Sequence, residues 1–144
     1  MLIEKFLSLN FEYTNLTLEN LDLTNYINWL QDPVVQEFIE SARGENSLQS
    51  ITDYIHEKNL SKQALLLGVF SKVGHAHIGN IKFEPIDLKE KTAWLGVLIG
   101  ERIYRGQGHS FEIINETTLK VSMIFGIKKF FLGVDPRNKR AHSA

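Results

Sequence analysis

The stretch Ile103–Glu112, with the sequence IYRGQGHSFE, contains two glycines that flank a single residue. An apolar run from Ala93 to Gly100 precedes it, and a helical pattern that ends at about Phe125 follows it. The order is therefore strand, glycine turn and helix. Glycine allows a tight turn with no Cβ beside a ligand, and the first amides of a helix lack carbonyl partners within the helix. Because these amides also lie at the positive end of the helix dipole, the turn predicts a phosphate or diphosphate site.

A short Gly-x-Gly also fits a simple strand-to-helix turn without a ligand, and this alternative stays open on the glycines alone. Two known phosphate loops are excluded. The turn has no Gly-x-x-x-x-Gly-Lys-Ser/Thr pattern, and no third glycine is placed for a dinucleotide fingerprint. It also lies late in the chain, whereas a dinucleotide-binding fold begins with its phosphate loop.

Composition is that of an ordinary soluble domain, with 43% hydrophobic and 23% charged residues in 144. This length predicts one domain, residues 1–144. There are no cysteines, so disulfides, thiolate metal ligands and cysteine nucleophiles are excluded. The N-terminus lacks a signal-peptide pattern and no apolar run approaches the length of a membrane span, so we expect a cytoplasmic protein without a membrane partner.

Charge is unevenly distributed along the chain. The net charge of −1 argues against nucleic acid as a partner. Residues 1–100 hold 8 Lys/Arg and 13 Asp/Glu, whereas residues 101–144 hold 8 and 4. A basic segment around the glycine turn suits an anionic ligand, although solvated helix faces explain part of this bias.

Apolar periodicity predicts an α+β fold in which a sheet is covered by helices. The expected strands are Phe11–Leu18, Ala64–Phe70, His75–Phe83, Ala93–Gly100 and Phe130–Val134. The three from Ala64 to Gly100 would form a meander. Expected helices are one capped by Asp22 or Thr24, a short one through Val35, Phe38 and Ile39, one capped by Ser47, and the helix that Gly126 ends.

The glycine turn resembles a known family. Arg105-Gly106-Gln107-Gly108-His109-Ser110 is similar to the acyl-CoA signature Gln/Arg-x-x-Gly-x-Gly/Ala of the GNAT superfamily of N-acyltransferases. The run LGVDPRNKRA at residues 132–141 resembles the fifth strand of that family and the start of its next helix. Within that superfamily, the pattern resembles the branch named for ribosomal-protein N-terminal acetyltransferases. The likeness implies a mixed, mostly antiparallel sheet, with a splay between the fourth and fifth strands.

The resemblance also implies where acetyl-CoA binds. The diphosphate would lie on the turn, the pantetheine arm would slot into the splay, and a bulge near Gly96 and Gly100 would open that splay. The residues implied for the cofactor are Val97, Leu98, Ile99, Arg105, Gly106, Gln107, Gly108, His109, Ser110, Phe111 and Asn138. The Leu98 amide would stabilise the oxyanion. Without the resemblance, the favoured interpretation is that Gly96 and Gly100 make room for Trp94 or another bulky neighbour.

The implied chemistry is direct transfer of an acetyl group to a primary amine of an amino sugar, a protein N-terminus or a small molecule. A base must take a proton from that amine. The candidates are Glu84 and His77, followed by Asp87 and the more distant Glu101; each is also a plausible surface side chain. His75 and His77 share a strand face, but no third ligand has metal-site spacing, so we expect no metal.

Two departures from the family pattern bear on activity. Ser110 stands where Gly or Ala is usual. The Tyr that serves the family as the acid for the leaving thiolate would fall one residue beyond Ala144. The closing C-terminal strands would then be missing, and the open edge of the fifth strand would be covered in a homodimer, unless the chain is a fragment. Three interpretations remain: an N-acetyltransferase, a truncated member that only binds CoA, and a binding module without CoA.

Overall fold

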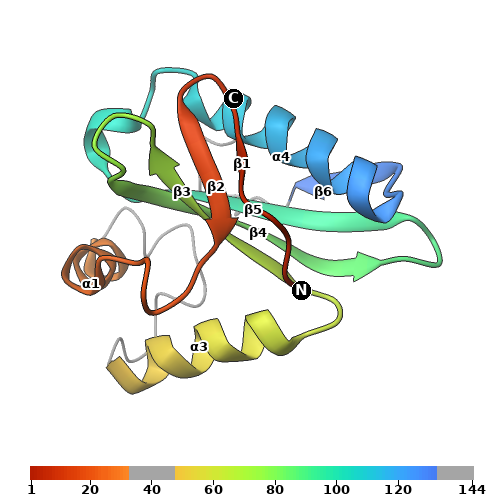
Figure 1. Ribbon diagram of the computed structural model, residues 1–144, viewed down its shortest axis with the longest axis horizontal. Coiled ribbons are helices and arrows are strands. Elements are labelled where there is room, and N and C mark those ends of the chain that lie inside the picture. Colours follow the sequence, from red (N-terminus) through yellow and green to blue (C-terminus); the bar gives the residue numbers. More distant parts are fainter. Residues whose placement is uncertain (33–47, 133–144) are drawn as a thin grey trace.

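The computed structural model describes residues 1–32 and 48–132, and these form a six-stranded sheet with helices on both faces (Figure 1). The sheet order is β1-β2-β3-β4-β5-β6. All neighbouring strands are antiparallel except β5 and β6, which are parallel. The mixed, mostly antiparallel sheet and the α+β class predicted from the sequence are therefore confirmed.

Strands β2 to β6 lie close to their predicted positions, whereas β1 was not predicted. The two N-terminal strands are β1 (Phe6–Leu7) and β2 (Phe11–Asn15). The meander consists of β3 (Leu65–Ser71), β4 (His77–Asp87) and β5 (Thr92–Ile99), and β6 is Lys129–Leu132. β3 is buried along its whole length, as a continuous apolar run predicts for a central strand.

Helices α1 and α4 each begin or end at a residue that the sequence marks. Helix α1 (Leu23–Gln31) is capped by Asp22, whose carboxylate accepts the Asn25 amide at 3.1 Å, so Asp22 and not Thr24 is the cap. Helix α4 (His109–Phe125) ends at Gly126, which has a φ of 72°. Helix α3 spans Leu48–Leu60. The short helix predicted through Val35, Phe38 and Ile39 and the Ser47 cap lie outside the described residues.

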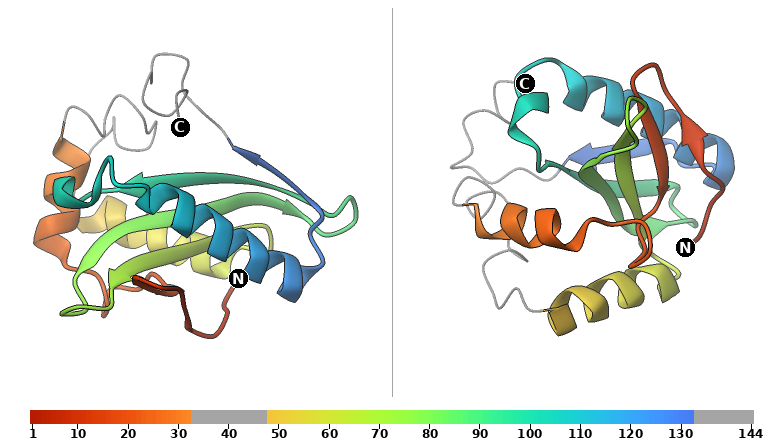
Figure 2. Two further views of the ribbon diagram at one scale, coloured as in Figure 1. Left: turned by 90° about the horizontal axis from the view of Figure 1, so that it is seen from above. Right: turned by 60° about the vertical axis from the view of Figure 1, so that its left-hand side comes forward.

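Two apolar layers hold the helices to the sheet. Helix α4 packs on one face, where Ile113 and Val121 join the inward side chains of β2–β5. Helices α1 and α3 lie over the opposite face (Figure 2), where Trp29 and Ile55 pack against Leu98. Side chains of a strand alternate between faces, so Trp94, Gly96 and Leu98 of β5 all lie on the α1/α3 face, whereas Val97 and Ile99 lie on the α4 face.

A bulge was predicted near Gly96 and Gly100, and the structure has a bulge-type pattern at Gly100, where the Gly100 and Glu101 amides both donate to the Ile78 carbonyl, at 2.9 and 3.2 Å. The β4–β5 register shifts between Phe83 and Ile86, whereas Gly96 pairs in regular register with Lys82. A Cβ at Gly96 would meet no described atom within 4 Å, so no described residue fills the space beside this glycine on the α1/α3 face. Gly100 instead accommodates the Trp29 ring, which a Cβ would overlap. The alternative of a glycine beside a bulky neighbour therefore holds at Gly100, and the neighbour is Trp29.

Candidate active site

The glycine turn has the predicted strand–turn–helix context. After β5, a 3₁₀ turn (η2, Arg102–Tyr104) leads to Gly106 and Gly108, whose φ angles are 73° and 78°. These angles lie in the left-handed region, which glycine adopts without a steric penalty. Gly108 is the N-cap of α4. A Cβ at either glycine would meet no atom of residues 1–32 and 48–132 within 4 Å, so none of these residues fills the space beside the turn.

A run of backbone amides at this turn has no acceptor. The Arg105 amide bonds to the Arg102 carbonyl at 3.0 Å, and the next paired amide is that of Glu112, which bonds to the Gly108 carbonyl at 3.4 Å. Between them, the amides of Gly106 to Phe111 have no acceptor within residues 1–32 and 48–132. They lie at the N-terminus of a 17-residue helix. Together they form a site for an anion such as a diphosphate.

The side chains of the turn are bound to neighbours other than these amides. The Gln107 amide group donates to the Ile103 carbonyl, and its oxygen lies 3.2 Å from Nε2 of His109. The His109 ring packs against Phe11 and Tyr104, with ring centroids 5.2 and 5.5 Å apart. The His109 ring thus anchors the turn to the sheet.

Glu112 fixes the first turn of α4 to the β1–β2 hairpin. Its carboxylate accepts hydrogen bonds from the Ser8 hydroxyl and from the Asn10 amide and side chain. Partial burial favours the neutral acid, but these hydrogen bonds outweigh it and lower the pKa of Glu112. The carboxylate is therefore held by neutral donors, and it orients the helix that carries the free amides.

The backbone of β5 presents alternate residues to its two neighbours. The Gly100 amide bonds to the Ile78 carbonyl of β4 at 2.9 Å. In an antiparallel ladder the hydrogen-bonded pairs occur at every second residue, so Leu98, paired with Asn80, directs its amide to β4. Val97 and Ile99 direct theirs to the β6 side. The amide predicted as the oxyanion donor, that of Leu98, is thus turned away from the side on which β6 lies.

The β6 side of β5 is paired only along its first half in the described structure. The parallel pairs run from Thr92 and Lys129 to Leu95 and Leu132. Val97 and Ile99 follow, beyond the described part of β6. We call their backbone groups on this side the β5 edge. The β6 side of the predicted splay, and Asn138, lie outside the described residues.

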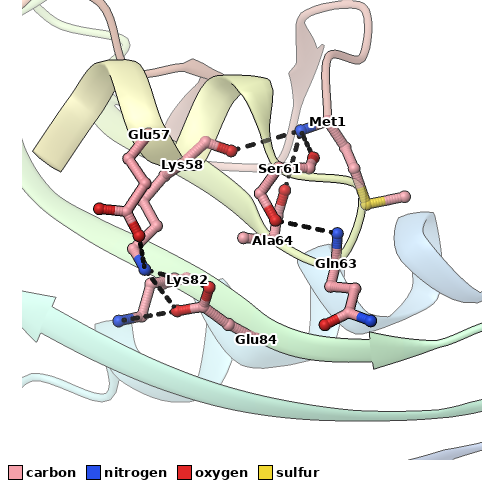
Figure 3. A network of polar contacts seen from close by, with 8 residues as sticks. All are labelled: Met1, Glu57, Lys58, Ser61, Gln63, Ala64, Lys82 and Glu84. Atoms are coloured by element: carbon pink, nitrogen blue, oxygen red, sulfur yellow. Dashed lines mark hydrogen bonds and ion pairs between the residues drawn. The ribbon is translucent and has the colours of Figure 1, made fainter. Parts of the chain in front are cut away.

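Glu84 is held in an ion-pair cluster on the α1/α3 face. Its carboxylate accepts from Lys58 Nζ at 2.8 and 3.0 Å, and Lys82 Nζ lies 3.6 Å away (Figure 3). Both ammonium groups lie 5.5 Å from the centre of the Tyr54 ring, and burial raises the pKa of that phenol to about 12. Glu84 is therefore already partnered and is not presented as a free base.

The α-ammonium of Met1 lies at the C-terminal end of α3, the helix that carries Lys58. It donates to the Ala64 and Ser61 carbonyls at 2.8 and 3.0 Å (Figure 3). The Asn59 and Lys58 carbonyls lie slightly farther away, at 3.3 and 3.5 Å. A positive group is stabilised at the C-terminus of a helix, where carbonyls lack amide partners. The N-terminus thus fixes the end of α3 from which Lys58 reaches Glu84.

His77 is buried among aromatic rings. Only 4% of it is exposed, and it contacts Tyr26, Trp29 and Phe70. Its Nε2 lies 2.7 Å from Oδ1 of Asn80, and its Nδ1 has no partner in the described structure. Burial lowers the pKa of His77, because it disfavours the charged imidazolium. The structure thus places His77 in the packed layer beneath α1, almost completely shielded from solvent.

The remaining candidates lie apart. Asp87 accepts the amides of Lys89 and Glu90 within the β4–β5 hairpin. His75 is exposed and lies 3.3 Å from a Glu12 oxygen. Glu101 accepts the Trp29 indole N–H at 3.0 Å. In the part of the chain that the structure describes, no group of three or more His, Cys, Asp or Glu could hold a metal ion, and no helix is long and apolar enough to cross a membrane.

Known structures with this fold include acetyltransferases. The ribosomal L7/L12 α-N-protein acetyltransferase RimL, in complex with coenzyme A, has a TM-score of 0.82 at 14% identity, over 97% of this chain and 80% of RimL. Spermidine N-acetyltransferase from Vibrio cholerae, in complex with CoA and spermine, has a TM-score of 0.76 at 16% identity. The match covers 92% of this chain and 76% of that enzyme. The microcin C7 self-immunity acetyltransferase MccE, in complex with acetyl-CoA and AMP, has a TM-score of 0.78 at 18% identity. The match covers 94% of this chain and 76% of MccE.

Sequence comparison gives the family. No curated protein sequence matches the chain. The sequence profile of the acetyltransferase (GNAT) domain matches residues 14–144, which is most of the chain. The profile spans the glycine turn and every described element from β2 to β6 except the first residues of β2. The chain therefore belongs to the GNAT family and is, as a member, an acetyl-CoA-dependent acetyltransferase domain.

Proposed function

We propose that this domain transfers the acetyl group of acetyl-CoA to a primary amine by direct attack. The amine nitrogen forms a bond to the thioester carbon, the carbon–sulfur bond breaks, CoA leaves as its thiol, and the amine loses a proton. The observation that carries the proposal is the run of amides from Gln107 to Phe111 at the N-terminus of α4, which have no acceptor among the described residues. No covalent enzyme intermediate is needed, which suits a chain without cysteine.

The donor site follows from the positions of the turn and of the β5 edge. The diphosphate would be bound by the turn amides. Since β5 leads directly into this turn, the pantetheine arm would run from the diphosphate along the β5 edge, past Ile99 and toward Val97. Val97 lies next to the end of the β6 pairing at Leu95. We therefore assign the oxyanion donor to the Val97 amide and not to that of Leu98.

The acceptor amine would approach from the α1/α3 face. On the α4 face, the side chains of Val97 and Ile99 pack against the main core. On the opposite face, no described residue fills the space at Gly96, beside the exposed Trp94 ring, which stacks on Phe131 with centroids 5.0 Å apart. Amino sugars, peptide α-amines and small amines remain the proposed classes. RimL and the spermidine enzyme act on a protein and on a small amine, respectively.

Two assays on the whole chain test this proposal. Isothermal titration with acetyl-CoA should show one binding site, and release of CoA thiol should depend on an amine in a panel of amino sugars, peptides with a free N-terminus and small amines. Failure to bind acetyl-CoA would contradict the donor site. Binding without thiol release for any amine would contradict transfer and favour a member that only binds CoA.

A further inference from the structure

The C-terminal end of α1 is tied to the segment that joins β5 to the diphosphate turn. Figure 2 shows α1 beside this segment in its left-hand view. The Trp29 ring covers Gly100, where a Cβ would overlap it, and the indole N–H donates to Glu101 at 3.0 Å. One turn later, Asp32 ends the helix. Two independent contacts thus join α1, a helix of the acceptor side, to the donor side.

Arg105 occupies the centre of this junction. Its Nε donates to the Ile99 carbonyl at 2.8 Å and its guanidinium donates to the Gly100 carbonyl at 3.0 Å. Ile99 belongs to the β5 edge, whereas the residue after Arg105 begins the turn. A planar guanidinium that holds two carbonyls fixes the distance between these two parts of the donor site.

Asp32 supplies the counter-charge of Arg105. Its carboxylate lies 3.7 Å from the Arg105 guanidinium, and both side chains are largely buried, at 9% and 18% exposure. The same carboxylate also accepts two bonds from Arg102, at 3.1 and 3.3 Å, but the Arg102 side chain is 73% exposed. Ion pairs of an exposed side chain contribute little, whereas a charge that is removed from water depends on its partner.

We propose that Asp32 is a positioning residue for the donor, which acts through Arg105. It keeps Arg105 on the two carbonyls, so that the β5 edge and the turn amides hold the spacing that one acetyl-CoA molecule needs. The inference rests on the proposed function, because it assumes that one ligand spans both parts. A ligand that touches only the turn should not depend on Asp32.

Binding of two probes tests the proposal on the full chain. CoA spans the turn and the β5 edge, whereas ADP carries the diphosphate without the pantetheine arm. In Asp32→Asn and in Arg105→Gln we expect the Kd for CoA to rise about tenfold, which is the loss of one charge-assisted contact. The Kd for ADP, measured by competition, should change by less than about twofold. The double variant, which carries both Asp32→Asn and Arg105→Gln, should bind CoA no more weakly than Arg105→Gln alone.

Arg102→Gln is the matched control, since it removes the exposed partner of the same carboxylate and should leave the Kd for CoA unchanged. The positioning role would be overturned if the variants weakened the binding of CoA and of ADP equally. It would also be overturned if the effects of the two substitutions on the Kd for CoA added up in the double variant. Asp32→Asn protein that binds CoA like the wild type would overturn it as well. Wild-type protein that does not bind CoA would instead refute the proposed function. Thermal melts of each variant separate these outcomes from loss of the fold.

Discussion

Replacement of Ser110 by Asp should strongly weaken donor binding while it leaves the fold intact or more stable. Ser110 is the second residue of α4 and lies within the run of free amides. A carboxylate in the first turn of a helix is favourable by about 0.3–1 kcal/mol, because it interacts with the helix dipole. The same charge beside a bound diphosphate costs about 4 kcal/mol at close range near a protein surface, so the Kd for acetyl-CoA should rise at least about a hundredfold.

Ser110→Asn provides the control for size. It adds the same number of heavy atoms without a charge, so we expect a Kd within about tenfold of the wild type. Calorimetric titration gives both constants, and thermal melts show whether α4 is retained. If Ser110→Asp and Ser110→Asn bound acetyl-CoA equally well, the diphosphate would not lie at this turn.

Replacement of Val97 by Pro should remove the proposed oxyanion donor without breaking the bonds between β4 and β5. The Val97 amide faces the β6 side, and proline is tolerated in strands where the missing amide points away from the ladder. Loss of one oxyanion donor lowers kcat by about 10²–10³-fold. Measured thiol release should therefore fall by this factor, while the Kd for acetyl-CoA changes much less.

Leu98→Pro is the matched comparison one residue along the strand. Because the Leu98 amide is turned toward Asn80 on β4, this change breaks a central ladder bond. We expect Leu98→Pro to lower the melting temperature far more than Val97→Pro does. A stable Leu98→Pro protein with a loss of kcat as large as that expected for Val97→Pro would show that the Leu98 amide is the donor after all.

Local patterns in the sequence predicted most of the elements. Asp22, Gly108 and Gly126 act through their own backbone or through residues three or four positions away, so their roles can be read along the chain. The apolar run of β3 and the alternation in β5 likewise follow from neighbouring residues. The strand, glycine turn and helix that suggested the family were therefore visible without any tertiary contact.

The contacts that orient the site are long-range and were not predicted. Asp32 and Arg105 are distant in the sequence, and so are Glu112 and Ser8, whose hydrogen bond spans 104 residues. A charged residue gives no sign of its partner, so neither pair had a signal beyond its residue type. The direction of the Leu98 amide depends on its register with β4, where a shift of one residue reverses it.

The most direct test of the donor site is an NMR titration of ¹⁵N-labelled protein with acetyl-CoA. The amide resonances of Gln107 to Phe111 should show the largest shifts, followed by those of Val97 and Ile99, whereas Leu98 and the outer face of α3 should change little. Saturable shifts elsewhere in the protein, with the Gln107–Phe111 resonances unmoved, would contradict a diphosphate site at the N-terminus of α4.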